Sequence, residues 1–165
     1  MAQTGSIVTV QVLSLLADNN TGLDSTLSEL SADSGVSLDS LSGAQLLGQN
    51  VAPEISEKTA GVRYPAVYVY CDKVSNTLRE KFRTFSGKAQ VTIEARVTAD
   101  RLAGIDQQMQ LYVDAITQVL DAHRGDWGQG LFYSGAYDVA YGAVKHGGRN
   151  FFQSGKVTLE VDISA

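Results

Sequence analysis

Two segments of this chain alternate without a fault between apolar and polar side chains. In residues 88–98 and again in residues 156–163, the apolar side chains occupy every odd-numbered position. Successive side chains of a strand point to opposite faces of a sheet, so a period of two indicates β-strands with one buried face and one wet or interfacial face. The chain must therefore fold around a sheet whose two faces differ.

Between these two strands the pattern becomes helical. In residues 101–123 the apolar side chains recur at spacings of three and four, which predicts an amphipathic helix. Gly125 is expected to take the left-handed position that ends this helix. Residues 6–17 and the leucines after Gly22 predict two more helices, separated by a break at 18–22.

Two further runs predict strands. Residues 66–73 are β-branched and aromatic throughout, which is typical of a strand buried on both faces. Residues 131–144 indicate one long strand, with a bulge at Gly135 or Gly142. The order of elements favours an α+β fold, with a mainly antiparallel sheet of about four to five strands packed on one side by two to three helices.

A chain of 165 residues is expected to form a single domain. We divide it into an N-terminal helical segment (1–30), a long loop (31–62) and a sheet-and-helix core (63–165). Loops of such length without structure are uncommon in compact domains. The loop is therefore expected to carry a short strand near 45–52, or to become ordered against a neighbouring subunit.

Charge is distributed unevenly along the chain. Residues 1–62 hold seven acidic residues and one basic residue, a net charge of −6, whereas residues 63–165 have a net charge of +1. The acidic part is either a solvated segment or one half of a head-to-tail contact between subunits. The overall charge of −5 argues against a general DNA-binding surface.

The motifs of common enzymes are incomplete in this sequence. The glycines of 43–50 have Walker A spacing, but Gln49 and Asn50 replace the residues that hold phosphate and magnesium. Ser134 lacks the preceding glycine of a nucleophile elbow. We expect no enzymatic activity and no cofactor.

The ionisable residues offer no metal or acid–base site either. His123 and His146 have no partners at metal-ligand spacing, and Cys71 is the single cysteine. The carboxylates on predicted strands are interpreted as exposed cross-strand charges: Glu94, Asp138 and Glu160. The N-terminal apolar stretch is too short for a bilayer, so we expect no membrane association.

The strongest local signal interleaves cations with aromatic residues in 78–88. It comprises Arg79, Lys81, Phe82, Arg83, Phe85 and Lys88. Such a segment can bind single-stranded nucleic acid, form a protein interface, or pack its aromatic residues beneath solvated cations. The complementary patch for an interface between subunits would be the acidic segment, with Asp33, Asp39, Glu54 and Glu57.

Near the C-terminus, two glycines lie between cations in the stretch "KHGGRNFF". Paired glycines between two strands predict a hairpin turn, whereas a phosphate-binding loop would lead into a helix. Lys145, His146 and Arg149 would then form a basic hairpin tip. This tip is a candidate for contact with DNA or with a neighbouring subunit.

The segments "RYPAVYVYCDKV", "EKFRTFSGKAQVTIEARVTADRL" and "GLFYSGAYDVAYGAVKHGGRNFFQSGKVTLEVDI" together resemble the tail terminator (tail completion) proteins of long-tailed bacteriophages and prophages. The resemblance spans about residues 45–165 and rests on the order of the segments and their pattern of residue types, since this family has no short diagnostic motif.

The resemblance implies a structural virion protein, located at the head-proximal end of the tail and assembled in the host cytoplasm. Tail terminators form a hexameric ring that caps the tail tube, stops its polymerisation and joins the neck or connector of the head. They have no catalytic residues. The alternatives are a neck or head-completion connector, a tail tube protein, or a nucleic-acid-binding module.

Overall fold

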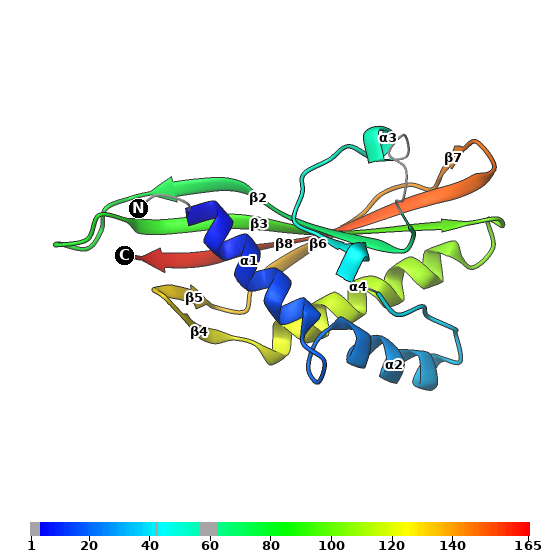
Figure 1. The fold of residues 1–165 in the computed structure, drawn as a ribbon, viewed down its shortest axis with the longest axis horizontal. Helices are drawn as coiled ribbons and strands as arrows, with labels where there is room; N and C mark the ends of the chain where they lie inside the picture. Colours follow the sequence, from blue (N-terminus) through cyan, green and yellow to red (C-terminus); the bar gives the residue numbers. More distant parts are fainter. Residues whose placement is uncertain (1–3, 42, 57–62) are drawn as a thin grey trace.

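The computed structural model describes residues 4–41, 43–56 and 63–165 and confirms the α+β class (Figure 1). Helices α1 (Thr4–Ala17) and α4 (Ile105–Ala122) pack on one face of an elongated sheet, and α2 (Leu23–Ser34) packs against α4. The break predicted between the first two helices is confirmed, with the carboxylate of Asp18 accepting hydrogen bonds from the N–H groups of Asn20 and Thr21.

Three long strands form the centre of the sheet: β2 (Ala66–Asn76), β3 (Ser86–Ala99) and β8 (Asn150–Ser164). They are antiparallel, and β3 and β8 pair along their whole length. The two-residue strand β1 (Leu46–Leu47) adds parallel to the start of β2. The described residues form eight strands in the order β1-β2-β3-β8-β5-β4, with β6 and β7 also paired to β8.

The odd-numbered face of the two alternating strands is buried under the helices, as predicted. Val91, Ile93, Val157 and Leu159 belong to one apolar cluster that also contains the inner side chains of α1 and α4. Helix α4 approaches β8 so closely at Gly155 that a β-carbon there would lie 2.8 Å from the sulfur of Met109. A side chain at this crossing would force Met109 or Val113 to shift.

The opposite face of β3 differs from the prediction. Lys88 is exposed, but Thr92, Glu94 and Arg96 are almost fully buried. Arg96 donates to Val51 and Ser56 in the segment that contains β1 and α3 (Pro53–Ser56), and it also pairs with Glu94, so the interpretation of Glu94 as an exposed charge is wrong. The hydroxyl of Thr92 donates to the carboxylate of Asp72 on β2. A second small cluster, formed by Ala66, Tyr68 and Tyr70 with Leu47, Val51 and Tyr64, shares this face.

The region expected to be a long loop contains more structure than predicted. Helix α2 continues to Ser34, a 3-10 turn spans Gly43–Gln45, and β1 and α3 follow. The short strand expected near 45–52 is confirmed as β1. Residues 57–62 lie outside the described residues.

The segment predicted as a single strand, 131–144, contains two short strands instead, and a third begins directly after it. These are β5 (Leu131–Tyr133), β6 (Tyr137–Tyr141) and β7 (Lys145–Gly147), which pair with successive parts of β8. The chain leaves the ladder at Gly135, whose φ of +100° favours glycine. The bulge expected at this glycine is thus a complete break in the strand.

The predicted cap at Gly125 is also wrong. Helix α4 ends at His123, whose backbone N–H donates to the carbonyl of Leu120. The indole N–H of Trp127 donates to the carbonyl of His123 at 2.7 Å. Since the helix end is satisfied in this way, Gly125, with a φ of +108°, serves as the first residue of β4 (Gly125–Gly128).

Candidate assembly surfaces

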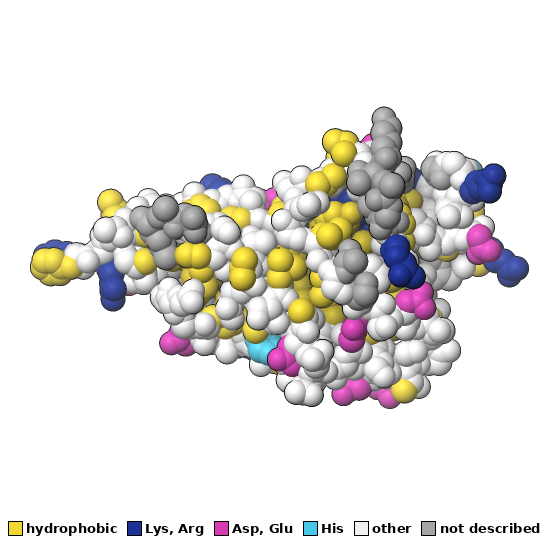
Figure 2. Space-filling view, in the orientation of Figure 1, with side chains coloured by type: hydrophobic (Ala, Val, Ile, Leu, Met, Phe, Trp, Pro, Cys, Tyr) yellow, Lys and Arg dark blue, Asp and Glu magenta, His cyan; other side chains and the backbone are white. Residues whose placement is uncertain are grey.

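The connection between β2 and β3 forms a tip that projects from one end of the long axis (Figures 1 and 2). Its base is held firmly. The side-chain oxygen of Asn76 accepts hydrogen bonds from the N–H groups of Leu78 and Ser86, and the C-terminal residue Ala165 accepts two from Thr84 and Phe85. A rigid base of this kind presents the outer residues of the tip in a defined place.

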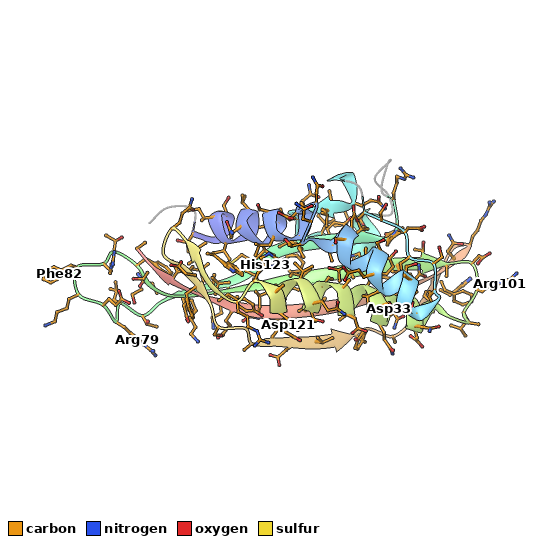
Figure 3. All side chains as sticks on the ribbon, turned by 90° about the horizontal axis from the view of Figure 1, so that it is seen from below. Asp33, Arg79, Phe82, Arg101, Asp121 and His123 are labelled. Atoms are coloured by element: carbon orange, nitrogen blue, oxygen red, sulfur yellow. The ribbon has the colours of Figure 1, made fainter. Side chains whose placement is uncertain are left out.

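The outer residues of this β2–β3 tip are apolar and basic. Phe82 is fully exposed and Leu78 is 60% exposed, and both have a positive φ, of +65° and +46°. Arg79, Lys81 and Arg83 are exposed on the same connection, and Figure 3 shows Arg79 and Phe82 toward this end of the molecule. A bulky residue with positive φ is uncommon, and such residues often lie at functional sites.

Phe85 behaves differently from Phe82. Its side chain is 7% exposed and belongs to the main apolar cluster. It therefore anchors the base of the tip and offers no surface to a partner. Only one of the two aromatic residues in the sequence signal is available for an interface.

Lys88 lies beside a groove on the open part of the sheet. Its ammonium group contacts the carboxylates of Glu160 at 3.0 Å and Asp162 at 4.0 Å. The hydrogen bond and charge of Glu160, and then the charge of Asp162, raise the pKa of Lys88. The groove has a volume of about 500 Å³ and also touches Arg79, so it connects this face with the β2–β3 tip.

The predicted acidic patch is divided in the structure. Asp33 and Asp39 are exposed on and just after α2, toward the end of the molecule opposite the β2–β3 tip (Figure 3). Glu54 is exposed on α3, across the sheet, and Glu57 lies outside the described residues. The term acidic face is used below for the exposed acidic residues on α2 and in the segment after it: Asp24, Glu29, Asp33 and Asp39.

Hydrogen bonds attach the segment that follows α2 to α2 itself and to α4. The hydroxyl of Ser31 donates to the carbonyl of Val36, and the carboxylate of Asp24 accepts a hydrogen bond from the N–H of Leu41 at 2.7 Å. The hydroxyl of Tyr112 donates to the carbonyl of Asp39, and burial raises the pKa of Tyr112 to about 12. The phenol therefore stays protonated and remains a donor at neutral pH.

The hairpin predicted at the C-terminal glycines is confirmed. Strands β7 and β8 pair from Lys145 to the turn, and Gly148 has a φ of +62° at the first of two loop positions, where type II′ turns carry glycine. Lys145, His146 and Arg149 are exposed, and the ring of His146 packs edge-on against Phe151. This basic tip lies at the opposite end of the molecule from the β2–β3 tip (Figure 1).

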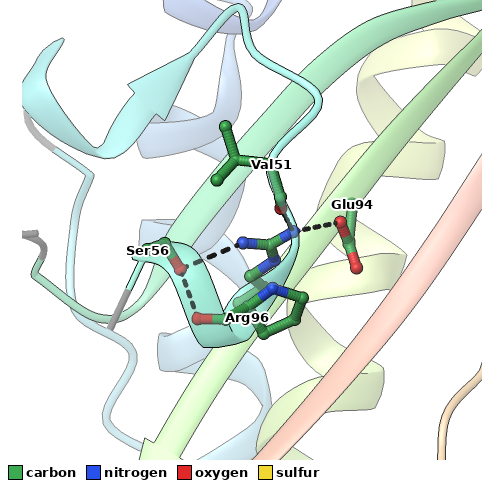
Figure 4. A network of polar contacts seen from close by, with 5 residues as sticks. Val51, Ser56, Glu94 and Arg96 are labelled. Atoms are coloured by element: carbon green, nitrogen blue, oxygen red, sulfur yellow. Dashed lines mark hydrogen bonds and ion pairs between the residues drawn. The ribbon is translucent and has the colours of Figure 1, made fainter. Parts of the chain in front are cut away.

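A buried ion pair was missed by the sequence reasoning. Arg96 donates to the carboxylate of Glu94 at 2.8 Å, to the carbonyl of Val51 and to the hydroxyl of Ser56 (Figure 4). Its guanidinium also lies 4.0 Å from the ring centre of Tyr68. The pair holds the β1–α3 segment against the sheet. The only sequence signal was the spacing of Glu94 and Arg96 on one strand face.

Within the described ranges, no group of three or more His, Cys, Asp or Glu residues is placed to hold a metal ion. None of the described helices is long and apolar enough to cross a membrane. Exposed charged residues of the described chain gather at the two basic tips, on the acidic face and beside the groove on the open part of the sheet.

No protein-family model matches this chain, and no curated protein matches it. Among solved structures, it is similar to a chain described as "Virion of native gene transfer agent (GTA) particle", with a TM-score of 0.46 and 13% sequence identity. The match covers 96% of this chain and 97% of that chain.

Proposed function

We propose that this chain is a structural virion protein, the tail terminator of a long-tailed phage or prophage. In this role it forms a ring of about six subunits through one repeated head-to-tail contact. The ring caps the tail tube, stops its polymerisation and gives the neck or connector protein a surface to join. Its partners are further copies of itself, the tail tube protein and the neck protein.

The placement of two oppositely charged surfaces carries this proposal. The β2–β3 tip has three exposed cations at one end of the long axis, and the acidic face lies toward the other end (Figure 3). A closed ring needs two different patches that face each other across every subunit boundary. Because the two surfaces are far apart within one chain, they are free to meet between chains.

Charge reversal of the β2–β3 tip tests this arrangement. The variant Arg79→Glu/Lys81→Glu/Arg83→Glu should weaken assembly while the melting temperature of the monomer stays close to that of the wild type, since all three residues are exposed. Arg83→Glu and Arg124→Glu form a matched pair, because each breaks one exposed ion pair with a carboxylate three residues earlier, Glu80 and Asp121 respectively. Only the tip variant should impair assembly in sedimentation experiments.

The same samples distinguish the alternatives. Rings of fixed height on added tail tubes, seen by negative staining, support a terminator. Tubes formed by the chain alone would identify a tube protein, and monomers in the presence of tubes would overturn the proposal. A salt-sensitive gel shift with DNA would instead favour the nucleic-acid-binding module.

The β7–β8 tip adds one expectation to this role. This tip is the hairpin between β7 and β8, at the end of the molecule away from the β2–β3 tip, and its exposed residues are Lys145, His146 and Arg149. We propose that this tip lines the lumen of the ring, where it makes non-specific contact with passing DNA, or meets a neighbouring subunit. Replacing Lys145 and Arg149 by Gln should leave ring formation intact if the tip faces the lumen.

A further inference from the structure

The exposed ring of Phe82 is an unusual feature for a protein surface. It stands on a tip whose base is fixed by hydrogen bonds that Asn76 and Ala165 accept, and Leu78 lies exposed on the same tip. Arg79, Lys81 and Arg83 are exposed on the same tip, where Arg83 pairs with Glu80 at 3.5 Å. An aromatic residue with arginine neighbours is the composition of an interface hot spot.

A pocket that suits such a residue lies at the acidic face. It has a volume of about 420 Å³ and is lined by Leu27, Ala32 and Leu38 together with Asp24 and three serines, Ser28, Ser31 and Ser40. Pockets of ~300–1,000 Å³ are large enough for small organic groups. The bonds of Ser31 to Val36 and Leu38 hold the outer wall of the pocket in place.

The charge that lines the pocket is opposite to those of the tip. Asp24 lines the pocket, while Glu29 and Asp33, five and nine positions further along the same helix, are exposed on its other side and add to the negative charge of this region. No lysine or arginine occurs between residues 1 and 57. A basic tip approaching this surface is therefore attracted before any apolar contact forms.

We propose that Phe82 of one subunit inserts into the pocket between α2 and residues 36–40 of the next subunit. Phe82 lies at one end of the molecule and α2, which lines the pocket, lies toward the other, so the contact is made between copies (Figure 3). The pairing of Arg79, Lys81 and Arg83 with the acidic face then orients the two subunits. This inference rests on the proposed function and identifies the residues of its repeated contact.

Truncation of the aromatic ring measures the energy of the contact. Phe82→Ala should raise the dissociation constant for assembly about 30-fold, as expected for a hot-spot residue. Val10→Ala is the control, because Val10 is also a large exposed apolar residue, on the outer side of α1. Equal assembly by both variants would overturn the proposal.

A cysteine pair gives a direct test of proximity. In a Cys71→Ser background, a Phe82→Cys chain is mixed with a Ser28→Cys chain, and disulfide-linked heterodimers are measured after mild oxidation. Ser28 is exposed and lines the pocket, and Ser134→Cys provides an exposed control position on the β5–β6 connection. We expect cross-links to position 28 and none to position 134.

The outcomes separate this inference from the function on which it rests. Rings without the 82–28 cross-link would overturn the proposed contact but leave the ring, and the tip would then face the tube or neck protein. Monomers without the cross-link would overturn both. Cross-linked open chains would support the contact and contradict the closed ring.

Discussion

One face of the sheet differs between its two ends. Near α3, Glu94 and Arg96 are buried beneath the β1–α3 segment, whereas nearer the β2–β3 tip Lys88 and Glu160 are exposed on the same face. Both ends have the same alternation of apolar and polar residues. The comparison shows that alternation identifies which side chains share a face, while a segment distant in sequence decides whether that face meets water.

The two ion pairs have similar lengths but different surroundings. The contact is 2.8 Å between Arg96 and Glu94 and 3.0 Å between Lys88 and Glu160. The side chains of the first pair are 2% and 5% exposed, and those of the second are 53% and 59% exposed. Removing one partner of a buried pair leaves an uncompensated charge, whereas water screens an exposed one.

The largest effect is expected from Glu94→Ala. The uncompensated guanidinium of Arg96 should lower the free energy of unfolding by about 3–5 kcal/mol. At ~2–4 °C for each kcal/mol in a chain of this size, the melting temperature falls by roughly 6–20 °C. Urea titration of the monomer measures the change. A loss below ~1 kcal/mol would mean that water reaches Arg96 at this end of the face.

A smaller effect on stability is expected from the double variant Glu94→Leu/Arg96→Met. Apolar replacement of a whole buried pair is often neutral or stabilising by ~1–4 kcal/mol. The carbonyl of Val51 and the hydroxyl of Ser56 lose their donor, however. Amide hydrogen exchange should therefore become faster in residues 51–56. If the double variant is as unstable as Glu94→Ala, the bonds to the covering segment matter more than the buried charge.

The smallest effect is expected at the exposed end, from Lys88→Met. The pKa of Lys88 is raised by Glu160 and Asp162, so its contribution is complete below the ordinary lysine pKa and is lost as pH rises through the raised value. The wild type and the variant should differ slightly at neutral pH and converge in strong alkali or high salt. Melting curves across pH check this, and a difference that persists in high salt would contradict the screening argument.

Local patterns were sufficient where a single element determines its own structure. Helix α4, the strands β3 and β8 and the turn at Gly148 all follow from periodicity or turn chemistry. The cover over Glu94 and Arg96 could not be predicted, because it depends on a contact between residues more than forty positions apart. The break at Gly135 was read as a bulge, since a glycine with positive φ is compatible with either.

The sequence predicted which residue types form the candidate interface, but not which of them are exposed or where they lie in the fold. The sequence indicates the basic and aromatic residues of 79–88, yet only burial separates the anchored Phe85 from the exposed Phe82. The acidic patch was predicted as a continuous segment, whereas folding places Glu54 across the sheet from Asp33. The pocket beside α2 has no sequence signature, because its wall depends on hydrogen bonds of Ser31 and Asp24.

The uninterrupted pairing of β3 with β8 has a mechanical consequence. The ladder runs from Ser86↔Ser164 at one end to Ala99↔Phe151 at the other, a span of about 44 Å at ~3.4 Å per residue. Its ends lie next to the β2–β3 tip and the β7–β8 tip. The sheet is therefore stiff along its length. A force applied to one tip is transmitted to the other by shear across the many hydrogen bonds of this ladder. The strand pair thereby keeps the two tips at a fixed distance from each other.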